Sequence, residues 1–296
     1  FVACDAGYSC SPRGIFVINY NSGRIVWEYL QGPSLWGNRF SVGDIENDGI
    51  LDISLPSGTP HNLCEENNSD DDELYCIVVK ENGDPRFCVR LSKLIGERHI
   101  NGCYSQKIID LDGDNEPEII GFEGHPVPWY PGKNRIHLID RDGTKIIKTW
   151  EGPENGNTWH SVIADINKDG KKEIIASTHY DEVDEDSREN LYVISYDLSS
   201  VLFSEKGGGI ALGANDIDGD GEIEIIVLQT KTKKLRVLNP DLTEQWSYQL
   251  GNAEHICWVG LFAISDLDGN GINEIIIAPS QTREDSLYVL EPKIER

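Results

Sequence analysis

Apolar residues along this chain gather in short runs, and many segments alternate between apolar and polar positions, which is typical of β-strands. Compact runs suited to buried strands occur at 119–122, 174–177, 225–228 and 275–279. Alternating segments that end in a turn recur at 15–23, 75–83, 136–143, 191–199, 235–242 and 287–293. Several of these are followed by another short strand with an aromatic residue, as at Trp27, Trp150, Phe203 and Trp246. The pattern predicts an all-β protein with almost no helix.

An acidic nine-residue phrase of the form DxDxDGxxE precedes the compact runs and organises the repeat. It occurs five times, at 44–52, 110–118, 165–173, 216–224 and 266–274, and these are called the first to fifth loops. Successive copies begin 66, 55, 51 and 50 residues apart. A fixed period of this length indicates a repeat architecture rather than a single irregular domain.

Each repeat contains four predicted strands, of which the first ends in the acidic loop. Four-stranded antiparallel units repeated without helices favour a β-propeller; a β-sandwich is the alternative, but it would not need the same loop in every unit. We predict one propeller domain over residues 1–296, with about six blades at 1–32, 33–92, 93–152, 153–206, 207–251 and 252–296. Because the chain shows six third strands and five first strands, seven blades with part of the ring missing is a second possibility.

The acidic loops present oxygen ligands at alternating positions, which suits Ca²⁺, a hard cation that takes six to eight oxygens. Side chains would ligate from positions 1, 3, 5 and 9, a backbone carbonyl from position 7, and position 6 must turn sharply. The expected ligands of about five calcium ions are Asp44, Glu46, Asp48, Ile50 and Asp52; Asp110, Asp112, Asp114, Glu116 and Glu118; Asp165, Asn167, Asp169, Lys171 and Glu173; Asp216, Asp218, Asp220, Glu222 and Glu224; and Asp266, Asp268, Asn270, Ile272 and Glu274.

Two other interpretations of the loops fit the sequence less well. An EF-hand needs a bidentate Glu at position 12 followed by a helix, and position 12 here is Leu55, Gly121, Ala176, Val227 or Ile277. Acidic turns that merely cap strands are common, but five in register, each with an acid at position 9 followed by Ile, favour a metal.

These loops resemble the FG-GAP repeat, known from integrin α propellers and from calcium-loaded bacterial and fungal propellers and lectins. The resemblance covers nearly the whole chain, although the FG and GAP dipeptides themselves are missing. It implies a calcium-binding propeller and a secreted or surface protein.

Charge and cysteine content narrow the cellular setting. The formal net charge of −25 disfavours nucleic acid, and no stretch is long and apolar enough to span a membrane. The sequence lacks methionine and shows no signal peptide, so we expect a processed or trimmed product. The cysteines could pair 4–10, 64–76 and 88–103 with Cys257 free, which predicts an extracellular, cell-surface or periplasmic location; seven reduced core thiols are the alternative. The acidic run at 69–73 is expected to be solvated.

A ligand face is expected on the side of the propeller opposite the acidic loops. Aromatic and imidazole side chains there form a plausible sugar or peptide platform, or they simply pack between blades. The candidates are Trp36, His99, Trp129, Trp159, His160, His255 and Trp258.

Three functions fit this sequence. We favour a binding or adhesion module for a glycan or a protein. A structural subunit that pairs with another chain or with itself through unmatched strands comes next. A polysaccharide lyase is third, because similar calcium-rich propellers act as lyases; Arg39, Arg98 and Lys133 are its few basic candidates.

Overall fold

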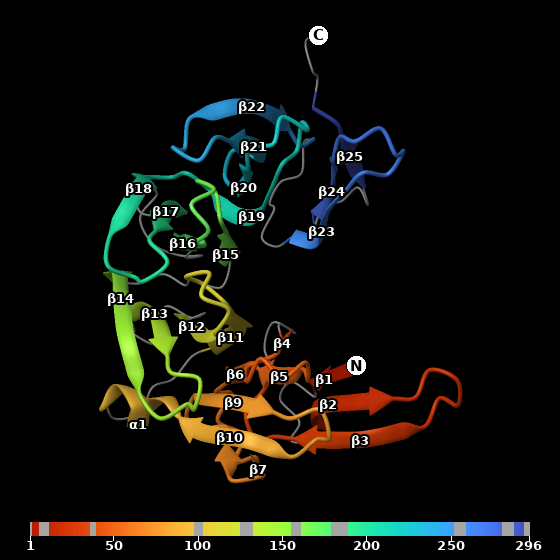
Figure 1. Ribbon diagram of the computed structural model, residues 1–296, viewed down its shortest axis with the longest axis vertical. Coiled ribbons are helices and arrows are strands. Elements are labelled where there is room, and N and C mark those ends of the chain that lie inside the picture. Colours follow the sequence, from red (N-terminus) through yellow and green to blue (C-terminus); the bar gives the residue numbers. More distant parts are fainter. Residues whose placement is uncertain are drawn as a thin grey trace. The chain divides into compact units, whose positions relative to one another are not determined.

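The computed structural model describes residues 2–5, 12–35, 40–97, 103–124, 133–154, 161–178, 189–251, 259–279 and 287–292. Nearly all of its regular structure is antiparallel sheet (Figure 1). The chain forms two compact units, Phe1–Trp159 and His160–Arg296, each of which contains three sheets of three or more strands among the described residues.

The first unit contains three main sheets. Their strand orders are β1-β2-β3, β10-β9-β5-β4 and β14-β13-β12-β11-β6. The strands are β1 (Val2–Asp5), β2 (Arg13–Ile18), β3 (Ile25–Leu30), β4 (Ser41–Gly43), β5 (Asp52–Leu55), β6 (Ser57–Gly58), β9 (Tyr75–Val79), β10 (Pro85–Arg90), β11 (Cys103–Ile109), β12 (Glu118–Gly124), β13 (Lys133–Ile139) and β14 (Ile146–Glu154). A hairpin of β7 (Glu65–Glu66) and β8 (Ser69–Asp70) and one short helix, α1 (Leu91–Ile95), complete it.

The second unit repeats the pattern with sheets ordered β15-β16-β17-β18, β19-β20-β21-β22 and β23-β24-β25. Its strands are β15 (Ser161–Ala164), β16 (Glu173–Thr178), β17 (Asn190–Ile194), β18 (Val201–Glu205), β19 (Ile210–Asn215), β20 (Glu224–Gln229), β21 (Lys234–Leu238), β22 (Glu244–Gln249), β23 (Val259–Ser265), β24 (Glu274–Pro279) and β25 (Tyr288–Leu290). The single five-residue helix in the described chain agrees with the all-β prediction.

The second strand of each repeat begins at loop position 9, and the isoleucine that follows is fully buried. These residues are Ile53, Ile119, Ile174, Ile225 and Ile275, all with zero exposed fraction. They join apolar clusters formed by neighbouring sheets, such as the cluster of Ile217, Ile226 and Ile275. Burial of the strand therefore fixes where each loop ends, because leaving one of these isoleucines exposed would cost about 1.5–3 kcal/mol.

A β-bulge recurs at the second residue of the fourth strand. In five sheets, the pairing of β2 with β3, β9 with β10, β13 with β14, β17 with β18 and β21 with β22 skips one residue of the later strand, and β3 is counted as the fourth strand of its repeat although its sheet has three. The bulged residues are Val26, Arg86, Ile147, Leu202 and Gln245.

The cysteine pairings expected from sequence spacing are wrong where the structure describes them. Cys76 and Cys88 are free thiols, which excludes the pairs 64–76 and 88–103. Burial raises the pKa of the Cys88 thiol to about 11, so it is protonated at neutral pH. No disulfide has both cysteines among the described side chains, although Cys64 is itself disulfide-bonded. Sequence spacing was a poor guide because Cys76 and Cys88 lie on adjacent strands as free thiols, Cys76 buried in the core and Cys88 partly buried against it.

Candidate metal centres in the acidic loops

The five acidic loops occupy equivalent places in their sheets. Each joins a first strand to a second strand, from β4 to β5, β11 to β12, β15 to β16, β19 to β20 and β23 to β24. All of the predicted metal ligands therefore lie on connections of one kind, as the repeat predicted.

The aspartate at position 1 holds the loop closed through backbone N–H groups. In the fourth loop, Asp216 Oδ1 accepts a hydrogen bond from Gly219 N at 2.7 Å, and Oδ2 accepts one from Gly221 N at 2.9 Å. In the first loop the donors to Asp44 are Asp48 N, at position 5, and Gly49 N, at position 6. Although desolvation opposes it, these donors lower the pKa of Asp44. Hydrogen bonds within the chain therefore contribute to the shape of these loops.

Two positions of each loop require a left-handed backbone. Position 6 was predicted to do so, and the φ values confirm it at Gly49, Asn115, Gly170, Gly221 and Gly271. Position 4 does the same, with φ between 55° and 78°, at Asn47, Gly113, Lys168, Gly219 and Gly269. Sequence reasoning missed position 4. The signal was present, because three of the five residues there are glycine and one is asparagine.

The glutamate at position 9, present in four of the five loops, connects the loop to the strand that follows. One of its oxygens accepts the N–H of position 2, as Glu224 does from Ile217 at 2.8 Å and Glu274 from Leu267 at 2.7 Å. This bond ties the start of the loop to the start of the next strand.

Carboxylate oxygens converge in the second and fourth loops. One oxygen from each of Asp110, Asp112 and Glu118 lies within 4.8 Å of the others, and Asp216, Asp218 and Glu224 form the same arrangement. Burial, together with the charges of Asp218, Asp220 and Asp216, raises the pKa of Glu224 to about 7. Crowded acids of this kind repel one another unless a cation lies between them, so this donor set fits a divalent ion.

Asparagine replaces one carboxylate in the third and fifth loops. Asn167 Nδ2 donates to Glu173 Oε1 at 3.0 Å, and a half-turn of this amide would turn its oxygen toward the same point. In the fifth loop Asn270 Oδ1 accepts the N–H of Ile272 at 2.7 Å, the bond that aspartate makes at this position elsewhere. Both loops keep the fold of their fully acidic counterparts with one charge fewer.

The first loop differs because an arginine lies against it. Arg86 Nη1 is 2.6 Å from Glu46 Oε1, and Arg86 Nε is 3.0 Å from Asp52 Oδ1. Glu46 and Asp52 stand at positions 3 and 9, where metal ligands were predicted. Both Glu46 oxygens and Asp52 Oδ1 are thus already paired with a cation, while Asp52 Oδ2 is buried without a hydrogen-bond partner.

Loops within the second unit contact one another. Lys168 of the third loop pairs with Glu222 of the fourth, with Nζ 2.5 Å from Oε1. Asn273 of the fifth loop donates from Nδ2 to the carbonyl of Asp216 at 2.7 Å. These contacts place the three loops of this unit side by side.

The acidic run at 69–73 is not simply solvated, contrary to expectation. Asp71 is fully buried and pairs with the equally buried Arg13 at 3.0 Å. Its carboxylate also accepts the backbone N–H groups of Asn62 and Cys64. The Asp71–Arg13 ion pair therefore joins residues 57–74, the long insertion between β5 and β9, to the first sheet.

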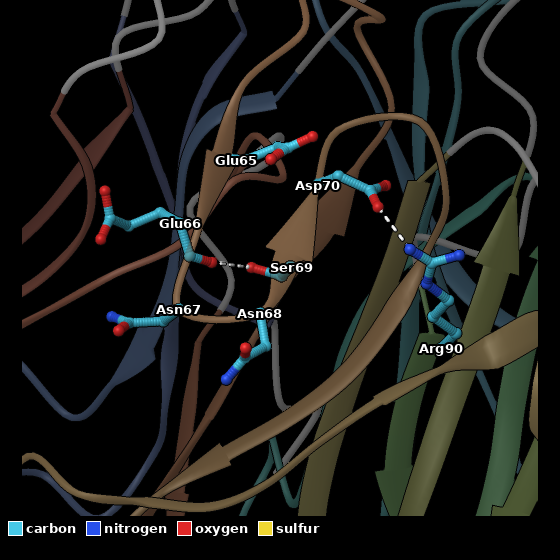
Figure 2. Close-up of a pocket in the computed structure, with 7 residues that line it drawn as sticks. All are labelled: Glu65, Glu66, Asn67, Asn68, Ser69, Asp70 and Arg90. Carbon is cyan, nitrogen blue, oxygen red and sulfur yellow. Dashed lines mark hydrogen bonds and ion pairs between the residues drawn. The ribbon is translucent and has the colours of Figure 1, made fainter.

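A polar hollow lies on this insertion (Figure 2). Glu65, Glu66, Asn67, Asn68, Ser69 and Asp70 line it together with Arg90 of β10, which pairs with Asp70 at 2.7 Å. Asn67 begins an N-x-S sequence, but its Nδ2 donates to the Leu30 carbonyl and Ser69 is almost fully buried. In the folded protein Asn67 is exposed, while its amide and Ser69 take part in contacts within the chain.

The residues of the predicted ligand face lie outside the described part of the chain: Trp36, His99, Trp129, Trp159, His160, His255 and Trp258. Arg39 and Arg98 also lie outside it, and of Lys133 only the strand position is described. A buried polar group is present on the same sheet as Lys133. There His137 pairs with Glu123 at 3.2 Å and with Thr149 at 3.0 Å, which identifies His137 as a satisfied core residue.

Comparisons with known proteins agree with this fold. Residues 110–176, which include the second and third loops, match the FG-GAP-like repeat model. No curated protein is similar in sequence to the chain. The rhamnogalacturonan lyase YesW superposes with a TM-score of 0.59 at 17% identity, over 95% of this chain and 51% of its own. The Bacillus licheniformis rhamnogalacturonan lyase PL11 gives 0.58 at 17%, over 94% and 51%, and the Dos1 propeller 0.55 at 9%, over 90% and 60%.

These matches show an all-β propeller fold with FG-GAP-like repeats. At such identities the structures indicate fold only, and the chain spans about half the length of the lyases it matches. The structure also shows that none of the described helical residues could form a bilayer-spanning segment. The division into six blades remains a prediction.

Proposed function

We propose that this chain is an extracytoplasmic, calcium-stabilised propeller that acts as a binding or adhesion module for a glycan or a protein. The observation that carries the calcium part is the convergence of three carboxylate oxygens in the second and fourth loops. Asp110, Asp112 and Glu118 would hold one ion, and Asp216, Asp218 and Glu224 another. The ion would supply the positive charge that these loops lack.

Calcium explains most of the unusual charge of the chain. Eighteen of its 51 acidic side chains stand at ligand positions of the five loops. Loops of this type suit the millimolar calcium found outside cells, where weak sites are still filled. The disulfide bond of Cys64 also supports an oxidising compartment.

A metal analysis tests the first half of the proposal. The protein is purified in calcium buffer, desalted and examined by elemental analysis, and its melting temperature (Tm) is compared with and without chelator. We expect several calcium ions per chain and a large fall in Tm on chelation. A protein without bound calcium, whose Tm ignores chelator, would contradict it.

The binding role is tested separately with a glycan array and with incubation on acidic polysaccharides. Saturable glycan binding without cleavage supports a binding module. Steady release of unsaturated products would instead support a lyase, a function suggested by the names of two matching structures. Measuring the mass in solution, with and without calcium, tests the assembly alternative, because self-pairing through strand edges would give more than a monomer.

A further inference from the structure

In three sheets, the bulged residue of the fourth strand lies against the acidic loop of the same sheet. Arg86, the bulged residue of β10, contacts Glu46 and Asp52 of the first loop. Gln245, its equivalent in β22, donates from Nε2 to Asp218 Oδ2 of the fourth loop at 3.1 Å. Ile147, its equivalent in β14, lines a hollow together with Asp114 and Glu118 of the second loop. One structural position therefore approaches three different loops.

The side chain at this position decides how much charge the loop retains. Isoleucine brings no charge to the second loop, and glutamine brings only a neutral amide to the fourth. Arginine brings a permanent positive charge to the first loop. Its guanidinium spans positions 3 and 9 at once, and the hydrogen bond from Arg86 lowers the pKa of Glu46.

The first loop also differs from the other loops in its acidic residues at the two positions that contact Arg86. Position 3 is Glu46 rather than aspartate, and position 9 is Asp52 rather than glutamate. Asp52 is 1% exposed and its Oδ1 accepts from Arg86, so this oxygen is committed to the guanidinium. A calcium ion at this point would have to displace Arg86 from its two carboxylate partners. The guanidinium, on a side chain that is only 18% exposed, would then lie without its partners beside the calcium ion, which is unfavourable.

We propose that Arg86 takes the place of the metal in the first loop, so that this loop binds no calcium and the chain carries four ions instead of the predicted five. The inference rests on calcium binding by the other four loops. It makes the bulged residue of the fourth strand the position that determines whether an acidic loop binds metal.

Calcium stoichiometry tests this directly. Elemental analysis and calorimetric titration of the full chain are expected to give four ions for the unmodified protein and five for Arg86→Gln, which copies the residue of the fourth loop. Arg141→Gln is the matched control, since Arg141 pairs with Glu116 at 3.6 Å through a side chain at position 7, where only the carbonyl would ligate. This control is expected to keep four ions.

A second pair of variants covers the case in which Arg86→Gln does not fold. Glu46→Ala and Asp218→Ala remove the side chain at position 3 of the first and fourth loops. We expect Glu46→Ala to keep all four ions and Asp218→Ala to keep three. Five ions in the unmodified protein, or loss of one ion in Glu46→Ala, would overturn the proposal. No calcium in any variant would instead refute the proposed function.

Discussion

The first and fourth loops share one backbone but resolve their negative charge in opposite ways. Both close on a position-1 aspartate and both turn left-handed at positions 4 and 6. In the first loop, Arg86 pairs with Glu46 and Asp52 from the neighbouring strand, and although burial raises the pKa of Asp52, the arginine opposes that shift. In the fourth, the acids face one another and the pKa of Glu224 rises to about 7. Loop shape and charge balance are therefore separate properties, and a residue outside the loop changes the second.

Chelation should have the largest effect and should spare only the first loop. Each occupied site adds about 2.7 kcal/mol when free calcium is 100 times Kd, and each kcal/mol shifts Tm by about 2–4 °C in chains of this size. Removing several ions is expected to lower Tm by at least about 20 °C. Thermal melts in calcium and in chelator measure it, with magnesium addition as the control.

The effect of Glu224→Gln on Tm is expected to have opposite signs in calcium and in chelator. In calcium it should lose one ion and about 5–10 °C of Tm, because the site is weakened. In chelator it should raise Tm, because a repelled charge is removed. Asp52→Asn is the matched variant in the first loop, and it should lower Tm equally in both conditions, since it breaks an ion pair that calcium does not touch. If both variants changed Tm in the same way in calcium and in chelator, the contrast between the first and fourth loops would be wrong.

The calcium-free protein should become less stable as pH rises from about 4.5 to about 7. Burial, then the neighbouring aspartates, raise the folded-state pKa of Glu224 from 4.5 to about 7. A raised pKa means that the folded state holds the proton more tightly, so its contribution is complete below 4.5 and lost above about 7. Denaturant melts in chelator across this range measure the slope. Glu224→Gln should flatten it, and an unchanged slope would count against the assignment.

Gln245→Arg should have the smallest effect on Tm and should clearly reduce the number of bound calcium ions. The new guanidinium would reach Asp218, as Gln245 does now at 3.1 Å, and would supply the charge that calcium otherwise brings. We expect one ion fewer with a Tm change of only a few degrees in calcium. Gln245→Glu, which adds no cation, is the control and should keep the ion. A full ion count in Gln245→Arg would break the proposed equivalence of the bulged positions.

Much of the fold could be predicted because its signals are local. The isoleucine after position 9 is buried in every repeat, and the left-handed backbone at position 6 coincides with glycine or asparagine. Alternation and turn residues likewise located the third and fourth strands. Each of these properties depends on a few consecutive residues, so the amino-acid order alone determined the strands, the repeat and the shape of the loops.

Contacts between distant segments were decided only by the tertiary structure. Arg86 lies 34 residues from Asp52, and its contact depends on a bulge that no local pattern announces. Asp71 reaches Arg13 across 58 residues, which is why an acidic run expected in solvent is partly buried. Cys76 and Cys88 lie close in sequence but remain unbonded in the core. Charge neutralisation and disulfide pairing depend on which side chains meet in space, and chain spacing does not encode that.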